Sequence, residues 1–265
     1  MKVYLHSGVT INYVERGTPA GLPVMFIHGF PFSHRMWEPQ MRALPHGIRA
    51  ISYDLRGHGE SQVADGQYTI EFLIDDLMAL LDHLVVDKAV LCGLSLGGYV
   101  ALRAVERYPD RVRALVLADT KSEPDSNEAK VKRSSTMLAV KRDGVPAFAE
   151  NFVKAVFAPQ NLTGQPQVVE FIKTLIRTNT QLGIAGTLLA LAARTDTTPA
   201  LAGIKVPTLI LVGEHDALTP PAASEAMHRL IPASQYIVIP GAGHLANLEN
   251  ETAFNQALVA FLKNV

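Results

Sequence analysis

Short apolar runs separated by turn residues recur along the chain and predict the strands of a sheet. The later runs are continuously apolar rather than alternating, which is typical of central parallel strands covered by helices on both faces. Between the runs, apolar positions repeat at the helical period, most clearly over residues 70–84, with Thr69 available as the N-cap. This alternation predicts right-handed crossovers and a doubly wound, mostly parallel α/β sheet. The predicted strands are 10–15, 23–27, 50–53, 89–92, 112–118, 207–212 and 235–239.

The alternation stops between residues 120 and 198, where no strand is evident and helical stretches occur near 145–157, 168–178 and 186–194. We therefore predict a core of residues 1–119 and 199–265, with a helical cap of residues 120–198 inserted before the penultimate strand. The cap is expected to cover the site; the alternative is a helical appendage with no role in binding. The basic cluster Lys130, Lys132 and Arg133 is interpreted as a solvated helix face.

Composition limits the possible partners. The 265 residues carry 24 basic and 25 acidic side chains and no long charge run, which argues against binding to nucleic acid or to an anionic membrane. No apolar stretch approaches a membrane span, and the amino terminus lacks the pattern of a leader. The single cysteine, Cys92, cannot form an internal disulfide. We expect a cytoplasmic protein that is a monomer or a small homo-oligomer.

A Gly-x-Ser-x-Gly pattern carries the first candidate chemistry. Residues Gly93-Leu94-Ser95-Leu96-Gly97 close the strand at 89–92 and open a helical stretch. This pattern, between a strand and a helix, is the nucleophile elbow of serine hydrolases, in which the serine occupies a strained backbone conformation on a tight turn. The alternative is a packed turn with a capping serine.

Two further polar residues follow predicted strands. Asp216 comes after the strand at 207–212, and His244 comes after the strand at 235–239, within Gly241-Ala242-Gly243-His244. Because the carboxyl ends of parallel strands meet at one edge of a sheet, we expect both side chains near Ser95. Asp119 follows the strand at 112–118 and is an alternative acid, although the loop at 213–216 favours Asp216.

Together with residues 24–31 (VMFIHGFP) and 54–61 (DLRGHGES), these motifs resemble the α/β-hydrolase superfamily along nearly the whole chain. Within it, the chain is most similar to small bacterial carboxylesterases, aryl esterases and 3-oxoadipate enol-lactonases. The resemblance implies an α/β-hydrolase fold in which Ser95 is the nucleophile, His244 the base and Asp216 the acid. It also implies an oxyanion hole made by the backbone amides of Phe30 and Leu96.

The charged residues of the 54–61 stretch are not assigned catalysis. Glycines alternate with Asp54, Arg56, His58 and Glu60, which indicates a turn that these side chains brace. The resemblance gives His28 the same bracing role in its own loop.

The expected activity is that of a serine hydrolase that cleaves small, largely apolar carboxylic esters through an acyl-enzyme. The alternatives are a lactonase of the enol-lactone or acyl-homoserine-lactone type, with perhydrolysis as a side activity, and a receptor-like protein without catalysis. We expect no cofactor, and no metal site because no metal-binding motif occurs. The cap lacks tyrosine and tryptophan, which favours an apolar pocket; the residues expected to line it are Phe30, Phe152, Leu218 and Leu245.

Overall fold

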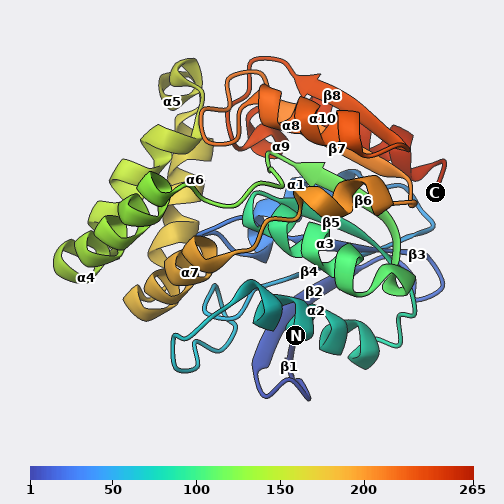
Figure 1. The fold of residues 1–265 in the computed structure, drawn as a ribbon, viewed down its shortest axis with the longest axis horizontal. Coiled ribbons are helices and arrows are strands. Elements are labelled where there is room, and N and C mark those ends of the chain that lie inside the picture. The colour runs from blue at the N-terminus through green and yellow to red at the C-terminus, as the bar shows by residue number, and fades with distance from the viewer.

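The computed structural model describes residues 1–265 and contains an eight-stranded sheet (Figure 1). The strand order is β1-β2-β4-β3-β5-β6-β7-β8. Strand β2 is antiparallel to both of its neighbours, β1 and β4, whereas all the other neighbouring pairs, from β4-β3 to β7-β8, are parallel. The strands are β1 (Lys2–Tyr4), β2 (Thr10–Arg16), β3 (Leu22–Ile27), β4 (Ile48–Tyr53), β5 (Ala89–Leu94), β6 (Val112–Ala118), β7 (Thr208–Gly213) and β8 (Ser234–Ile239).

Helices cover the sheet and form the insertion before β7. Helices α2 and α3 pack side by side, and α1 packs against α10. The predicted doubly wound, mostly parallel sheet with a helical insertion before the penultimate strand is confirmed. The helices are α1 (Glu38–Ala43), α2 (Ile70–His83), α3 (Leu96–Arg107), α4 (Asn127–Val156), α5 (Pro159–Gly164), α6 (Pro166–Arg177), α7 (Gln181–Ala193), α8 (Pro221–Leu230), α9 (Ala246–Glu249) and α10 (Glu251–Leu262), with short 3₁₀ turns at His34–Trp37, Pro109–Arg111 and Thr198–Gly203.

The register of the central strands aligns their carboxyl ends. Ile27 at the end of β3 pairs with Gly93 of β5, and Leu94 pairs with Ala118 at the end of β6. The loops that follow β3, β5 and β6 therefore leave the sheet at one level. In an open parallel sheet this edge is where ligands bind.

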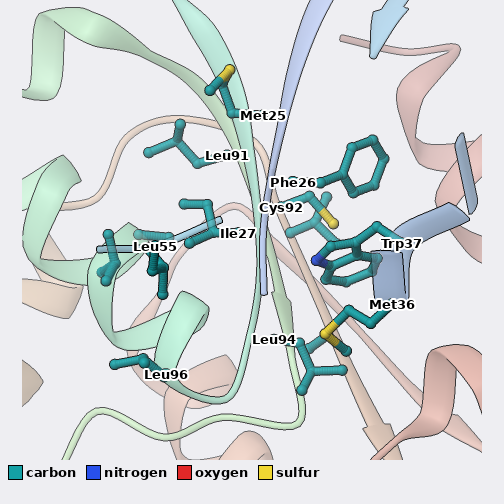
Figure 2. Packing of buried hydrophobic residues seen from close by; sticks show 14 of the residues in the cluster. Met25, Phe26, Ile27, Met36, Trp37, Leu55, Leu91, Cys92, Leu94 and Leu96 are labelled. Carbon is teal, nitrogen blue, oxygen red and sulfur yellow. The ribbon is translucent and has the colours of Figure 1, made fainter. Parts of the chain in front are cut away.

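The central strands are buried on both faces. Figure 2 shows Phe26 and Cys92 on the same side of the sheet as Trp37, with Ile27 and Leu91 on the other side. All five side chains are fully buried. Burial raises the pKa of the Cys92 thiol, which makes this cysteine an inert core residue rather than a nucleophile.

The insertion is a group of four helices, α4 to α7, gathered on one side of the molecule (Figure 1). Helix α4 is bent at Gly144, whose backbone (φ 85°, ψ 167°) is not helical. That φ favours glycine, and Pro146 follows inside the second half of the helix. None of the helices has the length and apolar character required to cross a bilayer.

Candidate active site

Ser95 lies on a strained turn between β5 and α3. Its backbone has φ 53° and ψ −110°, a conformation that residues with a side chain seldom adopt. The turn is possible because the neighbouring glycines lack a Cβ atom. A Cβ at Gly93 would lie 2.2 Å from the Gly97 carbonyl oxygen, and one at Gly97 would lie 2.1 Å from the Ile27 carbonyl oxygen. The strand and the helix can therefore approach closely only with glycine at both positions.

Two backbone amides near Ser95 have no hydrogen-bond partner inside the protein. One belongs to Leu96, the first residue of α3, and the other to Phe30, in the loop after β3. An amide at the first position of a helix has no partner within that helix and carries the positive end of the helix dipole. Both amides are thus free to donate to an anionic oxygen near Ser95.

His244 and Asp216 form a buried pair. His244 Nδ1 lies 2.9 Å from Asp216 Oδ2, and the Thr219 hydroxyl donates to the same Oδ2 at 2.7 Å. The other carboxylate oxygen, Oδ1, accepts the Leu218 and Thr219 amides at 2.8 and 3.0 Å. Burial opposes ionisation of Asp216, but the His244 ring and the Thr219 donors outweigh it and lower the pKa of the carboxyl group.

Asp119 lies close to this pair but does not contact the imidazole. Its carboxyl oxygens accept the Gly213 amide at 2.8 Å and the Ala246 amide at 3.3 Å. Complete burial, together with the charge of Asp216, raises the pKa of Asp119 well above its usual value. Asp119 therefore joins the end of β7 to the start of α9, and Asp216 is the carboxylate that contacts His244.

The loop that carries His244 is fixed to the cap by Glu249. Glu249 Oε1 accepts the Gly243 and Leu245 amides at 2.9 and 3.3 Å. Its Oε2 accepts the Ala158 amide at 2.8 Å and Asn161 Nδ2 at 2.7 Å. In addition, the His244 amide donates to the Val156 carbonyl, at the end of α4. The position of the imidazole is thus tied to the hinge between α4 and α5.

The turn after β4 is braced by buried side chains as expected, except that the Glu60 side chain is exposed and reaches only Lys2, at 3.5 Å. Asp54 accepts hydrogen bonds from the His34 ring and from the Glu60 amide, and Arg56 forms a bidentate pair with buried Asp76. His28 Nε2 accepts the Leu55 amide at 3.0 Å. Burial lowers the pKa of His28 to about 4 and that of His58 to about 3, so both rings are neutral at pH 7.

A cavity of about 600 Å³ connects the core and the cap. Ser95 and His244 both line it, as do residues from α4 and α7, so the nucleophile and the imidazole open into one chamber. The structure shows no hydrogen bond between Ser95 Oγ and the ring; in unliganded sites such bonds are often long and shorten when substrate binds. No group of three or more His, Cys, Asp or Glu side chains is placed to hold a metal ion.

Comparison with known proteins places the chain in a family. Residues 23–251 match the model of the alpha/beta hydrolase fold family. The chain belongs to the α/β-hydrolase family. A solved structure of a thermophilic esterase from Thermogutta terrifontis, with malate bound, is 40% identical, with a TM-score of 0.94 over 100% of this chain and 98% of that one.

Lactonases of the α/β-hydrolase family are also similar to this chain. A 3-oxoadipate enol-lactonase from Acinetobacter baylyi is 30% identical over 255 residues, which is 96% of this chain and 94% of the relative. The crystal structure of an enol-lactonase from Burkholderia xenovorans is 30% identical, with a TM-score of 0.92 over 99% of this chain and 100% of that one. Both esterases and lactonases are therefore among the relatives of this α/β-hydrolase.

The four residues expected to line the pocket of this α/β-hydrolase do not all reach it. Phe30, Phe152 and Leu218 line the cavity. Leu245 does not: it is fully buried in the core, because its amide is held by Glu249 and the chain turns into α9 directly after it. The place of Leu245 next to His244 in the sequence does not show on which side of the loop the leucine side chain packs.

The basic cluster also differs from the expectation. Lys130 and Lys132 are both exposed, as a solvated face requires, although Lys132 also lines the cavity. Arg133 lines the cavity too, but it is half-buried and paired with Asp125, so the interpretation as a solvated face is wrong for this residue. Other lining residues have no motif that could have shown them in advance. They include Tyr99, Lys121, Asp125, Phe148, Asn151, Leu188 and Leu191.

Proposed function

We propose that this α/β-hydrolase is a serine hydrolase that cleaves small carboxylic esters through an acyl-enzyme intermediate. The observation that carries the proposal is the His244–Asp216 pair, which opens into the same cavity as a serine on a strained elbow. A serine hydroxyl is a weak nucleophile at neutral pH and needs a base that is fixed in one tautomer. The contact of Asp216 with Nδ1 supports a ring that carries its proton there and leaves Nε2 free to accept one.

In the first half of the reaction, His244 Nε2 takes the proton from Ser95 Oγ while Oγ forms a bond to the ester carbonyl carbon. The carbonyl oxygen becomes an anion, and the free amides of Phe30 and Leu96 are the candidate donors to it. The intermediate collapses when the bond to the alcohol oxygen breaks, and His244 returns the proton to that oxygen. Ser95 then carries the acyl group.

In the second half, water replaces the alcohol. His244 takes a proton from the water while its oxygen attacks the acyl carbon, and the proton then returns to Ser95 Oγ as the acid leaves. A lactone would react by the same steps, except that the leaving oxygen stays attached to the acyl chain. The enol-lactonase relatives favour this second activity, which uses the same three residues.

The cavity supports substrates of limited size. Aromatic side chains form one part of its wall: the Phe30 ring lies 5.9 Å from that of Phe152 and 6.2 Å from that of Phe148, measured between ring centroids. Each methylene buried on such a wall contributes up to about 0.8 kcal/mol of binding free energy. We therefore expect acyl chains of roughly two to eight carbons to be favoured until they fill the cavity.

The test is a comparison of kcat/KM for p-nitrophenyl acetate, butyrate, octanoate and palmitate, with δ-valerolactone and an N-acyl-homoserine lactone measured alongside. We expect the highest value among the shorter esters and a loss of about 10⁴-fold or more in kcat in Ser95→Ala. A maximum at palmitate would contradict the size argument. Full activity in Ser95→Ala would contradict the mechanism, and higher values for a lactone than for every ester would make the lactonase the main activity.

A further inference from the structure

Part of the cavity lining is cationic. Three basic side chains form it: Lys121, which follows β6, and Lys132 and Arg133, in the first half of α4. We refer to these three residues as the cationic patch. Lys121 lies next to the nucleophile in the fold, because Thr120, the preceding residue, donates a hydrogen bond from Oγ1 to the Ser95 carbonyl at 2.9 Å. The cationic patch therefore belongs to the same chamber as the reacting serine.

The carboxylates near the cationic patch are already engaged by arginines. Buried Asp125 pairs with Arg133 and also with Arg194 at 3.0 Å, so that two guanidinium groups share one carboxylate. Asp143, the other acid of the lining, forms a bidentate pair with Arg142. Each acidic side chain of the lining thus faces at least one guanidinium group.

The two lysines, by contrast, have no anionic partner. No carboxylate lies within 4.0 Å of either ammonium group. Glu123, which follows Lys121 by two residues, does not line the cavity. Two unpaired ammonium groups, beside an arginine pair with an excess of positive charge, make this patch attractive to an anion. Lys121 is half-buried, so its attraction for an anion is stronger than in open water, whereas Lys132 is exposed and its attraction is screened by solvent and salt.

We propose that the preferred substrates carry a free carboxylate in addition to the scissile ester or lactone group, and that Lys121 and Lys132 bind this carboxylate. The inference rests on the proposed ester hydrolysis and adds the substrate class. The reacting carbonyl lies at Ser95, the aromatic part of the wall contacts the methylenes, and the carboxylate lies at the cationic patch. A neutral ester of equal length lacks the last of these contacts.

The experiment compares matched substrates at low ionic strength. The first pair is monomethyl adipate, which carries its carboxylate in the acyl part, and the neutral ester methyl hexanoate. The second pair is 4-acetoxybutyrate, which carries its carboxylate in the alcohol part, and the neutral ester butyl acetate. We expect kcat/KM of the anionic substrate to exceed that of its neutral partner by about tenfold or more in at least one pair. The ratio should fall as salt is raised from about 0.01 M to 1 M, because the Debye length shortens from about 30 Å to 3 Å.

Variants locate the contact. Lys121→Met and Lys132→Met should each lower the ratio of anionic to neutral kcat/KM by about three- to tenfold, since they keep the aliphatic stem and remove the charge. Lys130→Met is the matched control, because Lys130 lies on the same helix and is exposed like Lys132 but does not line the cavity, and its ratio should not change. Arg133 is left intact because its removal would leave Asp125 with fewer partners.

The outcomes separate the two proposals. The carboxylate subsite would be overturned, and the ester hydrolase left in place, if neutral esters are cleaved but the ratio of anionic to neutral kcat/KM is at or below one in both pairs. The same conclusion would follow if neither lysine variant lowers that ratio. If neither anionic nor neutral esters are cleaved, the proposed function itself is wrong.

Discussion

Asp216→Asn should disable the site by reversing the direction of one hydrogen bond. In the native structure Asp216 Oδ1 accepts two backbone amides, from Leu218 and Thr219. The asparagine oxygen must take that place, because an NH₂ group there would face two N–H donors. The NH₂ group then occupies the position of Oδ2, which lies 2.9 Å from His244 Nδ1. The ring can accept from it only if the imidazole proton moves to Nε2, the nitrogen that has to act as the base.

The expected loss in kcat is about 10⁴-fold, equivalent to roughly 5 kcal/mol in the activation free energy. Folding should be little affected, since the Thr219 hydroxyl can rotate and accept from the new NH₂ group. We expect the free energy of unfolding to change by no more than about 1.5 kcal/mol. The effect is thus much larger on catalysis than on stability.

The assay is kcat for p-nitrophenyl butyrate, with urea unfolding of the same preparations. Asp119→Asn is the matched control, because Asp119 is also a buried acid at this sheet edge but contacts only backbone amides, those of Gly213 and Ala246. It should lose less than about tenfold in kcat. If Asp119→Asn loses more activity than Asp216→Asn, or if Asp216→Asn keeps a tenth of native activity, the tautomer argument is refuted.

Three further outcomes are expected. Gly97→Ala should lower the free energy of unfolding by about 3 kcal/mol, because its Cβ would lie 2.1 Å from the Ile27 carbonyl oxygen. Gly164→Ala is the control, because that position has open space around it and should lose no stability. Equal urea midpoints for the two variants would contradict the prediction. Glu249→Gln presents an NH₂ group to a backbone donor, either the Gly243 amide or the Ala158 amide between α4 and α5. It should lower the free energy of unfolding, measured in urea, by about 1–3 kcal/mol and should also lower kcat. Unchanged stability would show that the Glu249 contacts are dispensable. Burial lowers the pKa of His28 to about 4 and that of His58 to about 3, so the unfolded chain binds more protons than the folded protein below about pH 6.5. The free energy of unfolding should therefore be full above that pH and fall by up to about 3 kcal/mol per ring toward pH 4. Urea unfolding at several pH values should show a shallower fall in His58→Asn than in the native protein, and an equal fall would refute this reasoning.

The parts of the site that depend on local geometry could be predicted from the sequence. The glycines around Ser95 are required by contacts across a turn of a few residues, so their spacing is visible in the chain. Asp216 and His244 are far apart in sequence, but each follows an apolar strand, and the parallel sheet brings strand ends together. Periodicity predicts both strands, and topology then brings the two residues together.

The cavity wall could not be predicted, because it depends on which side of each cap helix faces inward. The first half of α4 presents Lys132, Arg133 and Thr136 to the cavity, and this polar stripe has the same composition as a solvated face. An apolar pattern identifies a helix face that packs on a core, not one that lines a chamber. For the same reason the contact between Glu249 and Ala158, 91 residues apart, has no sequence signal.

The most direct test of the central claim is covalent labelling with an alkyl fluorophosphonate, followed by intact-mass measurement and peptide mapping. The account predicts one adduct per chain, on Ser95, and no adduct in Ser95→Ala, because only a serine activated by His244 beside oxyanion donors reacts rapidly with this reagent. An adduct on a different residue, or Ser95→Ala labelled at the native rate, would contradict the claim that Ser95 is the nucleophile.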